Sequence, residues 1–279
     1  MARLDRLGWA AAASGTCFGV KVGLRVSEAG AQREAVRRLP PGWNPSPRHS
    51  VDRLYSLVVG GDGSRRGVRR MYLLYADARL VVRTAVREEV MSALESEARL
   101  HVAEHARRRT FVHAGVVGWA GRAIVVPGRS HTGKSRLVQA LVRAGAAYYS
   151  DEYAVLDARG RVHAFPAALS IRESPEGPAC RIAAKDLGGS VLPPLPIGLV
   201  VVAPYAPDGR CRLRRASSGA GALALLAQSV PARRRPAEVL AHLAKAVGSA
   251  AVLVGVRGEA REAAQRLLSQ EATWPGDAS

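Results

Sequence analysis

The sequence predicts an α/β fold with a mixed β-sheet, preceded by a smaller region that combines helices and strands. Two pairs of apolar runs, in residues 110–126 and 148–165, are each separated by a short turn that contains glycine, which is typical of antiparallel hairpins. Between them, a glycine-rich segment joins one strand directly to a helical periodicity. Hairpins beside a strand–loop–helix unit indicate a sheet that contains both strand orientations.

The chain of 279 residues is long enough for one large domain or two smaller ones. We place a boundary after a long predicted helix, which gives residues 1–109 and residues 110–279 as the two regions. The longest apolar runs, such as 199–203 and 221–227, are too short to span a bilayer. The cysteines are scattered, and the alanine-rich segment near the N-terminus makes a poor signal peptide, so we expect a reduced, cytoplasmic location without a membrane partner.

The formal net charge of +18 raises the question of a nucleic-acid partner. The excess is spread along the chain as arginine, and aromatic residues make up only 5% of the sequence, which leaves few platforms for stacked bases. Clusters such as 107–109 and 233–235 are typical of solvated faces. Nucleic acid is therefore not the expected partner, although DNA binding by the arginines stays an alternative; an acidic peptide or protein fits the charge as well.

The N-terminal region is expected to begin loosely, with residues 1–15 lacking regular structure and residues 43–50 forming a loop. Period-2 and period-3.6 apolar patterns predict its elements. In chain order these are a strand at 18–26, a helix at 28–39, a strand at 54–59, a hairpin of 71–75 and 80–83, and a helix at 85–107.

The second region is expected to open with a hairpin of residues 111–117 and 122–126, so that the strand entering the glycine-rich segment is paired antiparallel. Residues 173–196 form the longest irregular stretch, which indicates a functional or mobile loop. The other predicted elements are a hairpin of 148–156 and 162–165, an extended segment at 168–172, strands at 197–203, 211–215 and 251–255, and helices at 219–226, 237–246 and 259–269.

The glycine-rich segment fits the phosphate-loop pattern G-x-x-x-x-G-K-[ST] at Gly128, Gly133, Lys134 and Ser135. An apolar run precedes it and a helical periodicity follows, so backbone N–H groups and a helix N-terminus would face one phosphate chain. Lys134 is one of only four lysines in a chain that otherwise uses arginine. We refer to residues 128–135 as the glycine loop. The residues expected to bind the nucleotide are Gly128, Arg129, Ser130, His131, Thr132, Gly133, Lys134, Ser135 and Arg136.

Two acids follow the next predicted strand, at Asp151 and Glu152. Because this strand comes directly after the helix of the glycine loop, both acids are expected beside the loop. With the hydroxyl of Ser135 they would hold Mg²⁺, and Asp151 would orient or deprotonate an acceptor hydroxyl. Adjacent strand residues face opposite ways, so both acids reach one site only if the strand ends or bends there. The alternative is an acid pair in a solvated turn.

Two further residues are candidate site residues because of where they lie in the predicted strands. His113 lies one strand from the glycine loop and would orient Asp151; the alternative is a packed, structural histidine. Arg172 follows the second hairpin and would contact a phosphate through its planar guanidinium group.

Three segments carry a family resemblance: His113-Ala-Gly115, the glycine loop, and Ser150-Asp-Glu152. Together they resemble the catalytic core of bacterial HPr kinase/phosphorylase and, more closely, its diverged HPr-kinase-related serine kinases. The resemblance covers roughly residues 110–205. It implies the mixed-sheet nucleotide-binding core that this family shares with phosphoenolpyruvate carboxykinase, in agreement with the two predicted hairpins.

The resemblance also implies roles for individual residues. Lys134 would contact the β- and γ-phosphates of ATP, and Ser135 would help to hold Mg²⁺. Asp151 matches the catalytic aspartate that accepts the seryl proton, and Glu152 stands at a second acid that is normally Asp. An ionised Asp151 beside Mg²⁺ is expected to keep a low pKa and to act as a weak, well-placed base.

The sequence departs from the family at the signature Glu-x-Arg-Gly, in whose place stands Phe165–Glu173. This difference argues against HPr itself as the substrate and against the reverse phosphorolysis. The expected activity is ATP-dependent phosphorylation of a serine in a peptide or protein, and family members that are homo-oligomers suggest the same for this chain. The alternatives are a nucleotide-binding regulatory protein without turnover and a small-molecule kinase.

Overall fold

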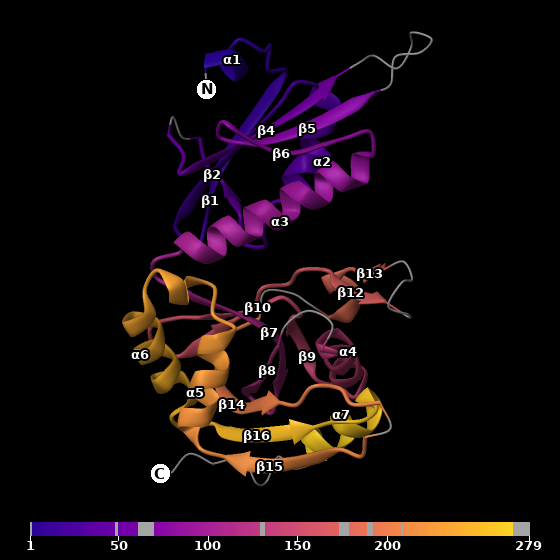
Figure 1. Cartoon of the computed structure of the whole chain (residues 1–279), viewed down its shortest axis with the longest axis vertical. Coiled ribbons are helices and arrows are strands. Elements are labelled where there is room, and N and C mark those ends of the chain that lie inside the picture. The colour runs from indigo at the N-terminus through magenta and orange to yellow at the C-terminus, as the bar shows by residue number, and fades with distance from the viewer. Residues whose placement is uncertain are drawn as a thin grey trace. The chain divides into compact units, whose positions relative to one another are not determined.

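The computed structural model divides into two compact units, Met1–Arg107 and Arg108–Ser279 (Figure 1). It describes residues 2–47, 50–60, 70–128, 132–172, 179–188, 192–207 and 209–269. Both units combine helices with β-sheet, so the chain is a mixed α/β protein as predicted.

The first unit contains a six-stranded sheet with the strand order β3-β1-β2-β4-β5-β6. β2 and β4 are parallel, whereas the other neighbours are antiparallel. Residues such as Val22, Leu24 and Leu57 of the sheet are buried, as are Leu94 and Val102 of α3, which contacts β2. The elements of the unit are α1 (Ala2–Asp5), β1 (Ala11–Cys17), β2 (Val20–Val26), η1 (Ala29–Ala31), α2 (Gln32–Arg37), β3 (Asn44–Pro45), β4 (Arg53–Gly60), β5 (Met71–Ala76), β6 (Arg79–Thr84) and α3 (Arg87–His105).

The prediction of loose structure at residues 1–15 is wrong, because residues 11–17 form β1, antiparallel to β2. The segment is made of small residues without apolar alternation, so its strand character comes from pairing and not from a local pattern. Gly15 permits the close approach of β3, since a Cβ there would lie 2.3 Å from the carbonyl oxygen of Asn44. The predicted loop at 43–50 likewise contains the short strand β3.

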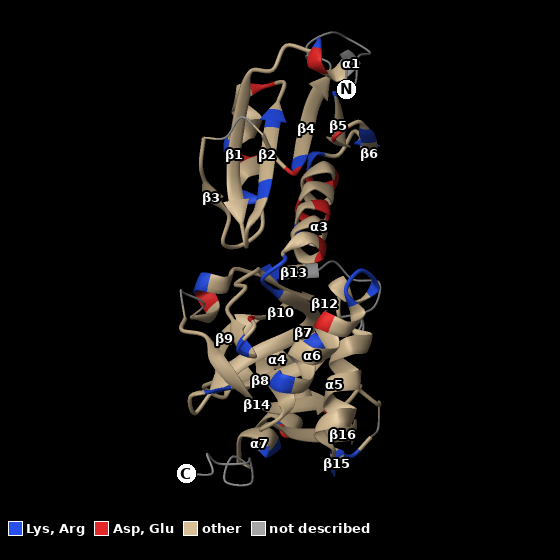
Figure 2. Cartoon of the chain, turned by 90° about the vertical axis from the view of Figure 1, so that its left-hand side faces the viewer, with Lys and Arg blue, Asp and Glu red and all other residues tan. Residues whose placement is uncertain are grey.

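Acidic side chains recur along α3 (Figure 2). Several of them pair with arginines of the same unit. Arg38 contacts Glu88 at 2.7 Å and Glu95 at 3.2 Å, and Arg79 contacts Glu97 at 2.6 Å. These ion pairs show that some arginines of the first unit neutralise acids of the same unit.

The second unit is organised around an eight-stranded sheet with the order β11-β10-β7-β8-β14-β16-β15, with β9 also paired to β7. β8, β14 and β16 are mutually parallel, while β7, β10 and β15 run antiparallel to their neighbours, so the predicted mixed sheet is confirmed. Its strands are β7 (Thr110–Trp119), β8 (Arg122–Pro127), β9 (Ala147–Ser150), β10 (Tyr153–Leu156), β11 (Arg161–His163), β14 (Leu195–Val202), β15 (Arg212–Ala216) and β16 (Ala251–Val256).

Helices cover both faces of this sheet, so a hydrophobic core lies on each face. Successive residues of a strand point alternately into one core and the other. Ile124 and Leu199 are buried in one cluster with residues of α4 (Lys134–Arg143) and α7 (Ala260–Ser269). Val125 and Val200 are buried in the other with residues of α5 (Ser218–Ala227) and α6 (Pro236–Val247). The three predicted C-terminal helices are therefore confirmed. None of the described helices combines the length and the apolar composition needed to cross a lipid bilayer.

The stretch predicted to be irregular, 173–196, is ordered in part. β12 (Leu169–Arg172) and β13 (Ala179–Ile182) form a separate antiparallel pair in which Leu169 opposes Ile182, and η2 (Ala184–Leu187) follows. Residues 173–178 and 189–191 lie outside the described part of the chain. The prolines and glycines of this stretch favoured a loop in the prediction. The strand β13 is defined by its cross-strand contacts with β12, which the local sequence does not report.

Candidate active site

The glycine loop connects β8, which ends at Pro127, to α4, which begins at Lys134. Gly133 has a φ of 78°, a left-handed conformation that favours glycine, and its carbonyl accepts the first hydrogen bond of α4 from Leu137 at 3.2 Å. This strand–loop–helix arrangement was predicted from the sequence. Arg129, Ser130 and His131, which were predicted to bind nucleotide, lie outside the described residues.

A glycine in β7 lets α4 approach the sheet closely. A Cβ at Gly115 would lie 2.4 Å from Cγ2 of Val138 and 3.2 Å from Cγ of Lys134. Any larger side chain at this position would push the start of α4, and Lys134 with it, away from β7. The sequence singled out Gly115 only as part of the family resemblance, and the structure supplies its physical reason.

The two predicted acids occupy a break between strands. β9 ends at Ser150 and β10 begins at Tyr153, although both strands pair with β7. The hydroxyl of Ser150 accepts hydrogen bonds from the backbone N–H groups of Glu152 at 3.1 Å and Tyr153 at 3.0 Å, which turns the chain at this point. The single strand predicted over 148–156 is therefore two, and the bend required to bring an acid to the glycine loop is present.

Asp151 reaches the glycine loop directly, because the hydroxyl of Ser135 donates a 2.7 Å hydrogen bond to its Oδ2. The half-buried Glu152 follows it, and its carbonyl oxygen accepts a 3.2 Å hydrogen bond from the N–H of Ala114. The solvated-turn alternative for the acid pair is thus wrong for Asp151. The side chains of Ser135 and Asp151 thus form a hydrogen-bonded pair at the N-terminus of α4.

Burial raises the pKa of Asp151 to about 6, although the charge of Lys134 and the hydrogen bond from Ser135 oppose the shift. The low pKa predicted for Asp151 beside Mg²⁺ stays a prediction; without the ion, desolvation outweighs the charge of one neighbouring cation. Oδ1 of Asp151 is buried without a hydrogen-bond partner among the described residues. A buried carboxylate oxygen of this kind can accept a contact from a bound ion, ligand or ordered water.

The donor set around Asp151 fits Mg²⁺, which prefers oxygen ligands and commonly takes only one or two carboxylates from the protein. The hydroxyl of Ser135 and the carboxylate of Asp151 are hard oxygen donors 2.7 Å apart. Within the described ranges, no group of three or more His, Cys, Asp or Glu side chains is arranged to hold a metal. Phosphate oxygens and water would therefore supply most of the coordination.

His113 lies in β7 opposite Tyr153, with ring centroids 4.7 Å apart. Burial and the positive charge of Lys134 lower the pKa of His113, while a hydrogen bond to the carbonyl of Glu152 opposes the shift. The role predicted for His113, to orient Asp151, stays a prediction, since no hydrogen bond between the two side chains is among the described contacts. The ring of His113 is held by Tyr153 and by the backbone at Glu152.

The predicted arginines differ in position. Arg136 is exposed on the first turn of α4. Arg172 ends β12, a strand that lies beside α4, and its side chain is outside what the structure describes. The structure therefore brings Lys134, Ser135 and Asp151 together, and it places the strand of Arg172 against α4.

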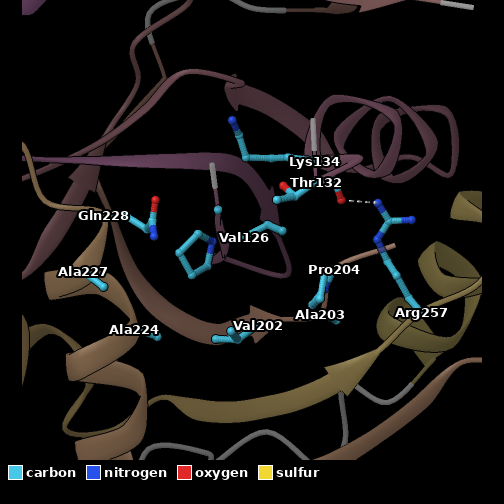
Figure 3. A pocket seen from close by; sticks show the side chains of 12 residues that line it. Val126, Thr132, Lys134, Val202, Ala203, Pro204, Ala224, Ala227, Gln228 and Arg257 are labelled. Carbon is cyan, nitrogen blue, oxygen red and sulfur yellow. Dashed lines mark hydrogen bonds between the residues drawn. The ribbon is translucent and has the colours of Figure 1, made fainter. Parts of the chain in front are cut away.

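Arg257 was not singled out in the sequence, where it is one of many arginines. It follows β16 and is only 2% exposed. Its Nη2 donates hydrogen bonds to the carbonyl oxygens of Gly133 at 2.7 Å and Thr132 at 3.4 Å, the contact drawn beside Thr132 in Figure 3. Its guanidinium group also lies 5.6 Å from the ring centroid of Tyr205. Arg257 thus holds the C-terminal half of the glycine loop in place.

A cavity of about 340 Å³ opens beside the glycine loop. Figure 3 shows the side chains of β8, β14, α5 and the glycine loop converging on it. The lining residues are Val126, Pro127, Gly128, Thr132, Lys134, Val202, Ala203, Pro204, Ala224, Ala227, Gln228 and Arg257.

No protein-family model matches the chain, and a search of curated proteins finds no match. The geometry of the site is therefore the basis for a proposed function.

Proposed function

We propose that the protein is an ATP-dependent kinase, with a core of the HPr kinase type, that phosphorylates a serine hydroxyl of a peptide or protein. One observation carries the proposal: Ser135, at the end of the glycine loop, is hydrogen-bonded at 2.7 Å to Asp151. The second oxygen of that carboxylate is buried without a partner among the described residues. A loop that suits phosphates and a carboxylate beside it supply the two requirements of phosphoryl transfer to a hydroxyl.

In this mechanism the residues mainly position the reactants. Backbone N–H groups of the glycine loop and the N-terminus of α4 hold the phosphates, and the ammonium group of Lys134 neutralises their charge. The seryl oxygen attacks the γ-phosphorus in line, the bond from that phosphorus to the β,γ-bridging oxygen breaks, and ADP leaves. Asp151 takes the proton of the hydroxyl.

Ser135 and Asp151 would hold Mg²⁺ together with phosphate oxygens, and Glu152 stands close enough for its charge to act on Asp151. The ion, when bound, neutralises the developing charge on the transferred group. Burial raises the pKa of Asp151 in the ion-free site, and with Mg²⁺ bound the carboxylate acts as a base through its position beside the acceptor hydroxyl.

The test uses the full chain with radiolabelled ATP, Mg²⁺ and serine-containing peptides with acidic flanks, chosen because the chain is strongly basic. Lys134→Ala and Asp151→Asn are expected to abolish labelling of the peptide while the melting temperature of the protein changes little. Two exposed positions supply matched controls, Lys245→Ala on α6 and Glu262→Gln on α7.

Wild-type labelling that survives Asp151→Asn would remove Asp151 from the mechanism. ATP binding without any labelled product would instead favour the regulatory alternative. Label that appears in a small molecule from a cell extract, and not in a peptide, would favour the small-molecule kinase.

A further inference from the structure

The cavity beside the glycine loop extends beyond the residues that the proposed transfer step uses. It lies outside the carboxyl ends of β8 and β14, which run parallel. In open α/β sheets, ligands bind in the crevice at this edge. Its volume of about 340 Å³ falls in the range of about 300–1,000 Å³ that is usual for small-ligand pockets. The cavity is therefore a candidate binding site in its own right.

The side chains around the cavity suit a ligand with an anionic part and a flat, uncharged part. Lys134 and Arg257 are cationic, and no carboxylate is among the described lining residues. Figure 3 shows Gln228 on the opposite side of the cavity from Thr132 and Arg257, with the apolar side chain of Val126 between them. A nucleotide has this distribution of polarity, since its phosphates are anionic and its base is planar and neutral.

The topology of the sheet gives the ligand a direction. Asp151 follows β9, which pairs with β7 on one side of β8, whereas the cavity is built from β14 and α5 on the other side. The glycine loop lies between the two. A phosphate chain whose terminal phosphorus faces Asp151 would therefore lead, at its other end, toward the cavity.

The amide side chain of Gln228 is the one polar group on the α5 side of the described lining. The backbone of Gln228 is held to β7, because its main-chain carbonyl oxygen accepts a 2.9 Å hydrogen bond from the N–H of His113. An amide offers one donor and one acceptor side by side, which complements the N6 and N7 atoms of adenine. Ala224 and Ala227 keep the neighbouring wall of α5 free of bulky side chains.

We propose that this cavity binds the nucleoside of the phosphate donor, with adenine between the apolar walls and its edge hydrogen-bonded to Gln228. The inference rests on the proposed function, because it takes the anion in the glycine loop to be the phosphate chain of a nucleotide. It adds a specificity-determining residue and assigns the base pocket to α5 and to the end of β14.

The experiment separates the nucleoside from the phosphates by using three probes: ATP, GTP and inorganic tripolyphosphate, each with Mg²⁺, in calorimetric titrations of the full chain. Ala224→Phe fills the cavity from α5. Leu223→Phe is the matched control, because the neighbouring Leu223 is 61% exposed and does not line the cavity. Gln228→Ala removes the amide from a half-buried position and provides a second, milder variant.

Ala224→Phe is expected to weaken ATP binding roughly tenfold or more and to leave tripolyphosphate binding unchanged. Leu223→Phe should change neither, and Gln228→Ala should narrow the preference for ATP over GTP. Unchanged ATP affinity in Ala224→Phe would overturn the inference, and so would an equal loss for ATP and tripolyphosphate or a higher KM for the acceptor peptide alone. Those results leave the proposed function standing, whereas a wild-type chain that binds neither ATP nor tripolyphosphate would overturn both.

Discussion

Replacing Arg257 with Met should loosen the glycine loop without emptying the space that the arginine fills. The guanidinium group is buried and donates to the carbonyl oxygen of Gly133 at 2.7 Å, with a longer bond of 3.4 Å to Thr132. A hydrogen bond from a charged donor contributes about 1.5–3 kcal/mol. Burial of the guanidinium group disfavours its charged form and lowers the pKa of Arg257. Replacing the charged group with Met therefore recovers part of the free energy that burying the charge costs. The expected net loss in the free energy of unfolding is therefore about 1–2 kcal/mol.

The effect on ATP binding should exceed what the loss of stability alone would produce, because the released carbonyls belong to the glycine loop. We expect ATP affinity to fall about tenfold, which corresponds to about 1.4 kcal/mol. Urea unfolding and calorimetric titration with ATP and Mg²⁺ measure the two quantities separately. Arg266→Met is the control, because Arg266 also bonds a backbone carbonyl, that of Cys211 at 2.6 Å, but does not touch the loop.

If the Arg257→Met protein binds ATP as tightly as the wild type, Arg257 does not shape the phosphate site. Arg257 would then only stabilise the fold, as Arg266 does. A variant that unfolds outright leaves the comparison to Arg257→Lys, which keeps the charge but loses the planar pair of donors, and which should bind ATP with intermediate affinity.

Two further predictions concern the packing of each unit. Gly115→Ala should cost about 1–3 kcal/mol in urea unfolding and weaken ATP binding, because its Cβ would meet Val138 at 2.4 Å. Gly219→Ala, whose nearest contact is 3.8 Å away, should do neither, and equal effects of the two would contradict this account. In the first unit, burial lowers the pKa of His101 to about 4, and Arg53 donates a 3.4 Å hydrogen bond to its Nδ1. The unfolded state then binds the proton more tightly, so stability should fall by up to about 3 kcal/mol as the pH falls from about 6.5 to about 4. A His101→Leu variant that keeps this pH dependence in urea unfolding would disprove the assignment.

Local patterns in the sequence were enough to predict most elements of the second unit. The alternating apolar runs around 110–126 and the glycine-containing turn between them predicted the hairpin of β7 and β8. The motif at Gly128–Ser135 predicted the loop and the start of α4. These elements could be predicted because strand pairing across a tight turn and the start of a helix depend on residues that are close together in the sequence.

Elements without a local pattern were missed or misjudged. β1 consists of small residues and exists through its pairing with β2 and β3, and β13 depends on its partner β12. The strand predicted over 148–156 is interrupted because the hydroxyl of Ser150 captures two backbone N–H groups. Such interactions are set by neighbours in space, which periodicity does not report.

The sequence by itself determined that a lysine, a serine and an aspartate would gather at one loop, since all three follow from a motif and the strand after it. Only the tertiary structure decided how that site is supported and charged. Arg257 lies 124 residues from Gly133 along the chain, and the burial that raises the pKa of Asp151 arises from the packing of β7, β9 and α4. Burial and long-range hydrogen bonds are properties of the folded chain, so they emerge only when distant segments are brought into contact.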